Sequence, residues 1–99
     1  MIENEIPLKQ KLNLETAKIS WKELQVFFAK GSLLQIEATE DLLSVAELIA
    51  ANDESAIESL ILNQKIGFAT PEWVKNNCTQ TTPLWTLVIA PYVLCQLAK

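Results

Sequence analysis

The sequence predicts an α+β domain in which paired helices pack on a small sheet of about three strands. Two observations carry this prediction: apolar residues recur at helical spacings of three and four, and short apolar runs of strand length separate those segments. A chain of 99 residues, 49% of them hydrophobic, with two glycines and four prolines, has the composition of a folded protein with one core. We therefore expect one domain.

The N-terminal segment divides into an irregular part and a predicted helix. Residues 1–6 show no periodicity and are predicted to be disordered, which leaves residues 7–99 as the domain. Pro7 suits the first position of a helix. A helix over about residues 8–18 is expected because three apolar side chains fall near one face: Leu8, Leu12 and Ile19.

A second helix and a first strand follow. Ser20, with Glu23 three residues later, matches a capping box in which each side chain bonds the other residue's free amide. The helix is expected from Trp21 to about Lys30, and Gly31 suits a left-handed turn at its end. Residues 32–37 are too short for a helix and alternate loosely, so they predict a strand.

Residues 40–64 predict an antiparallel pair of helices. Thr39 is expected to cap the first helix, and Asn52 or Asp53 the second. Both helices have apolar stripes at helical spacing, formed by Leu42, Val45, Ala46 and Ile49 in the first and by Ala56, Ile57, Leu60 and Ile61 in the second. The short connection between them favours antiparallel packing.

The remaining helix signal is short and lies between two predicted strands. Residues 65–69 predict a strand, and Thr70 with Pro71 marks a strong helix start. That helix is expected to end by Asn77. The apolar stretch LWTLVIA at residues 84–90 is rich in β-branched and bulky residues and predicts the last strand. Pro91 leaves residues 92–98 open between a continued strand and a short helix.

The apolar C-terminal strand leads to a prediction of self-association. Its continuous apolarity is typical of a strand covered on both faces, and three strands in a small domain would leave one sheet face bare. A homodimer would cover that face through Trp85, Leu87, Val88 and Ile89. Two alternatives stay open: helices of one molecule cover both faces, or the short apolar terminus lies at a membrane surface.

Charge and cysteine content restrict location and partners. The chain has a net charge of −4 and contains no Arg and no His, which disfavours nucleic acid as a partner. The apolar C-terminal run is shorter than the roughly twenty residues that a spanning helix needs, so no membrane span is expected. The N-terminus has no apolar signal region, which predicts a cytoplasmic protein. Cys78 and Cys95 are therefore expected to be reduced, and Cys95 to be buried and inert.

A family resemblance covers nearly the whole chain. The matching segments are residues 12–24 (LNLETAKISWKEL), 28–31, 41–46, Trp73 and residues 85–96. Together they resemble an uncharacterised family of small bacterial proteins, catalogued as a domain of unknown function (2288). The resemblance implies a single domain in a bacterial cytoplasm. It brings no activity, cofactor or catalytic residue.

The residues themselves favour binding over catalysis without deciding whether the protein is an enzyme. Without His the usual Ser or Cys relay cannot form, no metal site is completed, and isolated glycines form no phosphate loop, so no cofactor is expected. The three tryptophans predict core anchors. We therefore expect a non-catalytic interaction or regulatory protein. The alternative is a small-ligand binder or unrecognised enzyme that uses the neighbourhood of Glu15, Thr16, Trp21 and Glu23.

Overall fold

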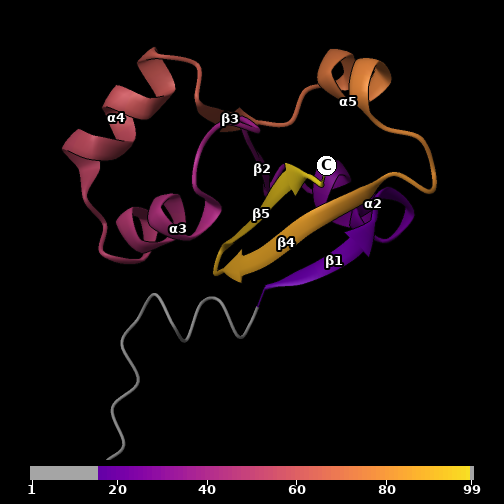
Figure 1. The fold of residues 1–99 in the computed structure, drawn as a ribbon, viewed down its shortest axis with the longest axis horizontal. Helices are drawn as coiled ribbons and strands as arrows, with labels where there is room; N and C mark the ends of the chain where they lie inside the picture. Colours follow the sequence, from indigo (N-terminus) through magenta and orange to yellow (C-terminus); the bar gives the residue numbers. More distant parts are fainter. Residues whose placement is uncertain (1–15, 99) are drawn as a thin grey trace, which may run out of the picture.

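A computed structural model describes residues 16–98, which form four helices and a five-stranded mixed sheet (Figure 1). The helices are α2 (Trp21–Ala29), α3 (Leu42–Ala50), α4 (Glu54–Leu62) and α5 (Pro71–Asn77). The strands are β1 (Ala17–Ser20), β2 (Leu33–Ile36), β3 (Ile66–Phe68), β4 (Pro83–Ile89) and β5 (Tyr92–Leu97). The α+β class is confirmed, whereas the prediction of about three strands was wrong.

Two strands account for the wrong count. The predicted disordered segment and most of the predicted first helix lie outside the described residues. The last two residues of that helix, Ala17 and Lys18, belong instead to β1, an edge strand that is held by pairing with β4. Residues 92–97 form β5, which is not a continuation of β4 because the chain reverses at a turn containing the cis Ala90–Pro91 bond.

The strand order is β1-β4-β5-β2-β3. β1, β4 and β5 pair antiparallel in sequence, β5 pairs parallel with β2, and β3 pairs antiparallel with β2 at the far edge. The second half of the apolar C-terminal stretch thus becomes the central strand of the sheet. β5 is buried along its length, because it has strands on both edges and helices on both faces.

Helices cover both faces of the sheet. Figure 1 shows α3 and α4 together on the left and α2 and α5 on the right. One core cluster contains side chains of α3 and of the sheet: Leu34, Ile36, Leu42, Val45, Ala46, Ile66, Leu87 and Leu94. The other lies on the opposite face with α2, and half-buried side chains of α5 pack against it: Trp21, Leu24, Leu33, Leu84, Val93 and Cys95. One molecule thus has a core on each side of its sheet.

The covering is diagonal, which explains the burial pattern of β4. On the α2 face Leu84 and Thr86 are buried but Val88 is exposed, whereas on the α3 face Leu87 is buried but Trp85 is partly exposed. Because side chains alternate between the faces of a strand, each pair of helices protects a different end of β4. The expectation that β4 is covered along both faces was therefore wrong.

Helix ends follow local sequence with two exceptions. Asp53 and Thr70 cap α4 and α5 as predicted, and Gly31, with φ of 76°, ends α2 in a left-handed turn. Ser20 does precede α2, but its side chain makes no capping hydrogen bond, so the predicted capping box is absent. Asp41 caps α3 in place of Thr39.

Candidate functional site

The ligand-binding neighbourhood predicted from the sequence does not converge among the described residues. Glu15 lies outside them. Thr16 precedes β1 and Trp21 follows it, so their backbones are separated by roughly 16 Å at the usual rise of a strand. Trp21 is buried in the α2 core, while Glu23 is exposed on α2. No shared cavity can therefore be built from Thr16, Trp21 and Glu23.

The three tryptophans lie on different faces of the sheet. Trp21 packs edge-on against Phe28 with ring centroids 5.6 Å apart, and Trp73 of α5 packs against the same core. Trp85 lies on the opposite face, where the Lys18 Nζ atom is 5.1 Å from its ring centroid. Trp21 and Trp73 thus serve as core anchors, and Trp85 is a partly exposed ring that Lys18 covers.

The residues predicted to form a dimer interface do not share one surface. Leu87 is buried at 1% exposure, and Ile89 is half-buried against the same core. Val88, at 59% exposure, faces the side of the sheet opposite to Trp85. The reason for expecting self-association, a bare sheet face, is therefore absent. Self-association through β4 stays a prediction.

A hollow beside Trp85 has a structural explanation. It is lined in part by Glu40, Asp41 and Gln96. The Gln96 side-chain amide donates to the backbone carbonyls of Glu37, at 3.0 Å, and Glu40, at 2.7 Å. These bonds tie the segment before α3 to the central strand, so the polar atoms of Gln96 fix a loop and leave little for a ligand.

The described residues hold no set of groups suited to catalysis. Over residues 16–98 no three His, Cys, Asp or Glu side chains gather in a metal-binding arrangement. Within the same range no helix has the length and apolarity to cross a membrane. Burial raises the pKa of the Cys95 thiol to about 12 and also raises the pKa of Cys78, so neither thiol is activated as a nucleophile.

A groove between α4 and β3 is the strongest candidate site. It has a volume of about 640 Å³. Its walls are mainly apolar and come from β2, α3, α4, β3 and β5: Leu34, Ile49, Ile57, Ile61, Phe68 and Tyr92. Phe68 and Tyr92 form an aromatic pair there, with ring centroids 6.1 Å apart. Because α4 has no fully buried residue, it lies over the sheet without closing the groove.

Two side chains leave apolar surface at the mouth of this groove. Ile61 of α4 is 52% exposed and Phe68 of β3 is 54% exposed. Neighbouring exposed apolar side chains of this size are a common mark of a binding surface, whereas single ones are ordinary. The groove therefore combines a preformed apolar floor with an apolar rim.

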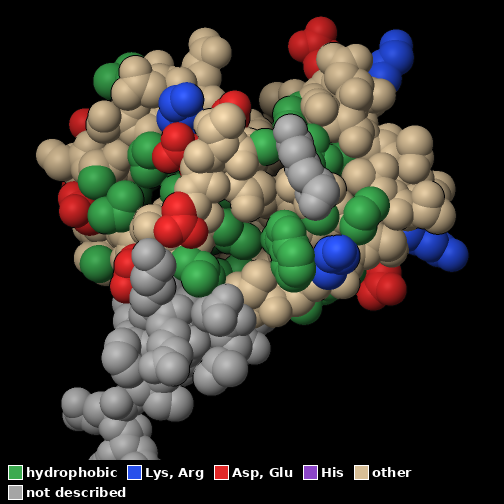
Figure 2. All heavy atoms as spheres, in the orientation of Figure 1, with side chains coloured by type: hydrophobic (Ala, Val, Ile, Leu, Met, Phe, Trp, Pro, Cys, Tyr) green, Lys and Arg blue, Asp and Glu red, His purple; other side chains and the backbone are tan. Residues whose placement is uncertain are grey.

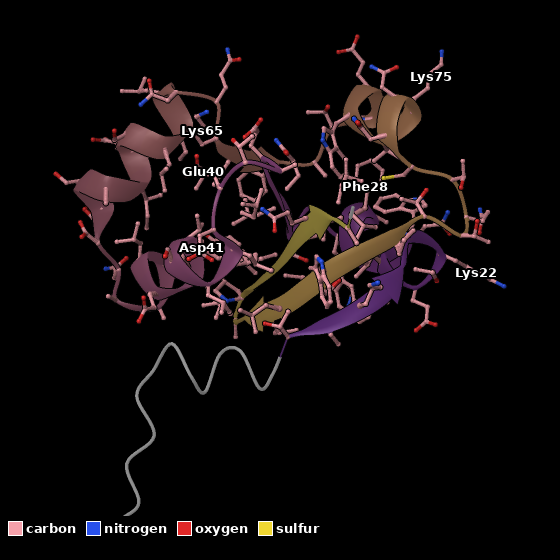
Figure 3. All side chains as sticks on the ribbon, in the orientation of Figure 1. Lys22, Phe28, Glu40, Asp41, Lys65 and Lys75 are labelled. Atoms are coloured by element: carbon pink, nitrogen blue, oxygen red, sulfur yellow. The ribbon has the colours of Figure 1, made fainter. Side chains whose placement is uncertain are left out.

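The charge around the groove is negative. Glu54 and Glu58 line it, and Figure 2 shows acidic side chains gathered over α3 and α4. Figure 3 shows Lys22 and Lys75 pointing outward from α2 and α5, on the side away from α4. Since residues 31–64 contain seven acids and no Lys, the sequence already placed this charge, and the fold concentrates it beside the groove.

Sequence reasoning missed the groove because its walls come from five separate elements. One signal was present: the stripe of α4 was predicted to be buried, yet Ile57 and Leu60 are only half-buried and Ile61 is exposed. A short amphipathic helix flanked by acids can cover a core or border a groove, and its pattern is the same in both cases.

Comparisons with known proteins agree with the fold and give no activity. The sequence model of the family described as "Protein of unknown function (DUF2288)" matches residues 7–97. A Pseudomonas aeruginosa protein, PA1075, has an NMR solution structure similar to this chain, with a TM-score of 0.82 and 37% sequence identity. The match covers 100% of this chain and 92% of that one. None of the curated proteins compared with the chain matches it.

Proposed function

We propose that this chain, which belongs to the family of proteins of unknown function DUF2288, acts by binding another protein and not by catalysis. The α4–β3 groove carries the proposal: it is apolar inside, acidic at its rim and open between a helix and a sheet edge. Its occupant is expected to present apolar side chains flanked by Lys or Arg, which complement Glu54 and Glu58.

The apolar contact is expected to supply most of the affinity. Covering the exposed parts of Ile61 and Phe68 removes apolar surface from water, at about 25 cal/mol per Å². The carboxylates of Glu54 and Glu58 are exposed, so they are expected to select the partner's charge and to speed association more than to strengthen binding.

The experiment is selection of random twelve-residue peptides on the wild-type protein, followed by affinity measurements on two variants. Ile61→Asp places a charge in the groove, whereas Leu62→Asp makes the same change on the next residue, which is 81% exposed and does not line the groove. We expect selected peptides to lose at least about tenfold in affinity, or about 1.4 kcal/mol, on Ile61→Asp and to bind Leu62→Asp as they bind the wild type.

Two outcomes would contradict the proposal. One is selection that yields no peptide above background. The other is a set of peptides that bind Ile61→Asp and Leu62→Asp equally well, because the groove would then not be their site. Circular dichroism of both variants checks that the fold is kept; it is expected to be, since both positions are more than half exposed.

A further inference from the structure

Building on the proposed function, we infer that the partner binds as an added β-strand: an extended segment pairs with the free edge of β3 and places alternate side chains in the α4–β3 groove. The segment is expected to carry Lys or Arg opposite Glu54 and Glu58, and apolar side chains opposite Ile61 and Phe68. This mode uses main-chain hydrogen bonds for affinity and side-chain pockets for specificity.

The backbone of β3 has unused hydrogen-bonding groups at this edge. The Glu37 N–H donates to the Lys65 carbonyl at 2.8 Å, and the Ala69 N–H donates to the Leu33 carbonyl at 2.9 Å. In an antiparallel ladder bonded and non-bonded pairs alternate, so Gly67 is in a bonded pair with β2. The amide and carbonyl groups of Ile66 and Phe68 therefore point away from β2, toward the free edge.

The side chains of the same two residues face the groove. Ile66 and Phe68 line it, and Ile66 lies in the same core cluster as Leu34 and Ile36. An added strand alternates its side chains in the same way, so every second side chain enters the space between β3 and α4. The free backbone groups and the groove thus belong to one surface.

The rim of the groove fits such a strand in charge and spacing. Glu54 and Glu58 are four residues apart on α4, which separates them by about 6 Å along the helix axis. Alternate side chains of an extended strand are about 6.6 Å apart. Two Lys side chains at positions i and i+2 of the partner can therefore each meet one carboxylate.

A second copy of this chain fits the edge less well. Pairing of two β3 edges about a twofold axis would place both α4 helices on the same face of the joined sheet. The glutamates of the two helices would then approach each other, and like charges repel. β3 itself carries no charged side chain, a device by which sheet edges commonly resist pairing with other chains.

The experiment uses a designed nine-residue peptide, Thr-Lys-Thr-Lys-Thr-Val-Thr-Val-Thr, labelled for fluorescence polarisation. Two derivatives have methylated backbone nitrogens, one at every Lys and Val and the other at the three internal threonines. An added strand uses only alternate amides toward its neighbour, so one derivative is expected to lose at least about tenfold in affinity while the other keeps it. In antiparallel pairing the methylated Lys and Val residues abolish binding.

A pair of protein variants tests the charge. Glu58→Lys is expected to weaken binding of the unmethylated peptide at least about fivefold at low salt, whereas the matched Glu72→Lys on α5 leaves it unchanged. Phe68→Pro removes an edge N–H as well as the ring, while Phe68→Ala removes only the ring. We therefore expect weaker binding to the proline variant than to the alanine variant.

The outcomes separate this inference from the proposed function. If both methylated derivatives bind alike, or the unmethylated peptide fails to bind, strand addition is wrong; selected peptides that depend on Ile61 would still support the groove as a binding site. If no peptide, selected or designed, depends on Ile61, the groove itself is wrong as a site. A rise in sedimentation coefficient with protein concentration that Phe68→Pro abolishes would instead identify a second copy as the occupant.

Discussion

Cys95 shows how one residue's environment fixes its chemistry. It lies on the central strand β5 and is fully buried in the α2 core, with Cys78 packed against the same cluster. Burial, and to a smaller extent the neighbouring Cys78, raises the pKa of the Cys95 thiol to about 12 from an ordinary value of 9.0. The inertness expected from the sequence therefore has a physical cause, desolvation of the thiolate.

The raised pKa predicts a loss of stability at high pH. The folded protein keeps the Cys95 proton up to a pKa of about 12, while the unfolded chain releases it above 9.0. The contribution is thus complete below pH 9 and is lost as pH rises toward 12, by up to about 1.4 kcal/mol per pH unit. Urea unfolding at pH 8 and pH 10 should show a smaller decrease for Cys95→Ala than for the wild type.

The matched control is Cys78→Ala. Its thiol is half-exposed, so this variant is expected to keep most of the wild-type pH dependence, because Cys95 remains. Tyr and Lys side chains also titrate in this range, but they are common to all three proteins and cancel in the differences. Parallel pH curves for the wild type and Cys95→Ala would contradict the assignment.

At the scale of elements, the helix starts show where local sequence is sufficient. Thr70 accepts a hydrogen bond from the Trp73 amide at 3.1 Å, and Asp53 accepts one from the Ala56 amide at 3.2 Å, as their positions predict. The Thr39 hydroxyl bonds the Glu37 carboxylate instead of capping α3. Asp41 takes that place, because its carboxylate accepts from the Leu43 amide and from the Ser44 hydroxyl.

These caps predict a difference in stability between two similar substitutions. Asp41→Ala should lower the free energy of unfolding by about 1 kcal/mol, because it leaves an amide of the first turn of α3 without its acceptor. Ser20→Ala should cost clearly less, because the Ser20 side chain makes no capping bond to α2. Urea denaturation measures both. Equal costs would mean that the capping box is present after all.

The whole molecule is a sheet with a helical layer on each face, and this arrangement decides which apolar residues are buried. Leu87 and Val88 are neighbours in one apolar run, yet Leu87 is 1% exposed and Val88 is 59% exposed. The difference arises because α3 covers Leu87 from one face, while α2 and α5 cover the other face at the opposite end of β4.

This arrangement predicts opposite results for two lysine substitutions. Leu87→Lys should lower the free energy of unfolding by more than about 3 kcal/mol, because it buries an unpaired charge and removes a packed side chain. Val88→Lys should change it by less than about 0.5 kcal/mol. Thermal unfolding at two protein concentrations tests whether one molecule suffices: a midpoint independent of concentration fits, whereas a rise would show that a second copy contributes.

Most of the elements could be predicted from the sequence because their signals are local. The end of α2 at Gly31, the caps of α4 and α5, and the existence of β2, β3 and β4 depend on side chains a few residues apart. β1 could not be predicted, since its short sequence AKIS has no strong strand pattern and only the edge of β4 holds it in place. The turn at Pro91 was visible, but not the direction that the chain takes after it.

The sequence by itself thus determined the α+β class, the helices of residues 21–62 and the acidity of the middle of the chain. Only the tertiary structure decided that the apolar C-terminal stretch folds into two adjacent strands under helices of the same molecule, and that α4 stands over an acidic, apolar groove at the edge of β3. The reason is that propensity and capping act within a few residues. Strand order, and the face that each helix covers, arise from contacts between segments that are distant in the chain.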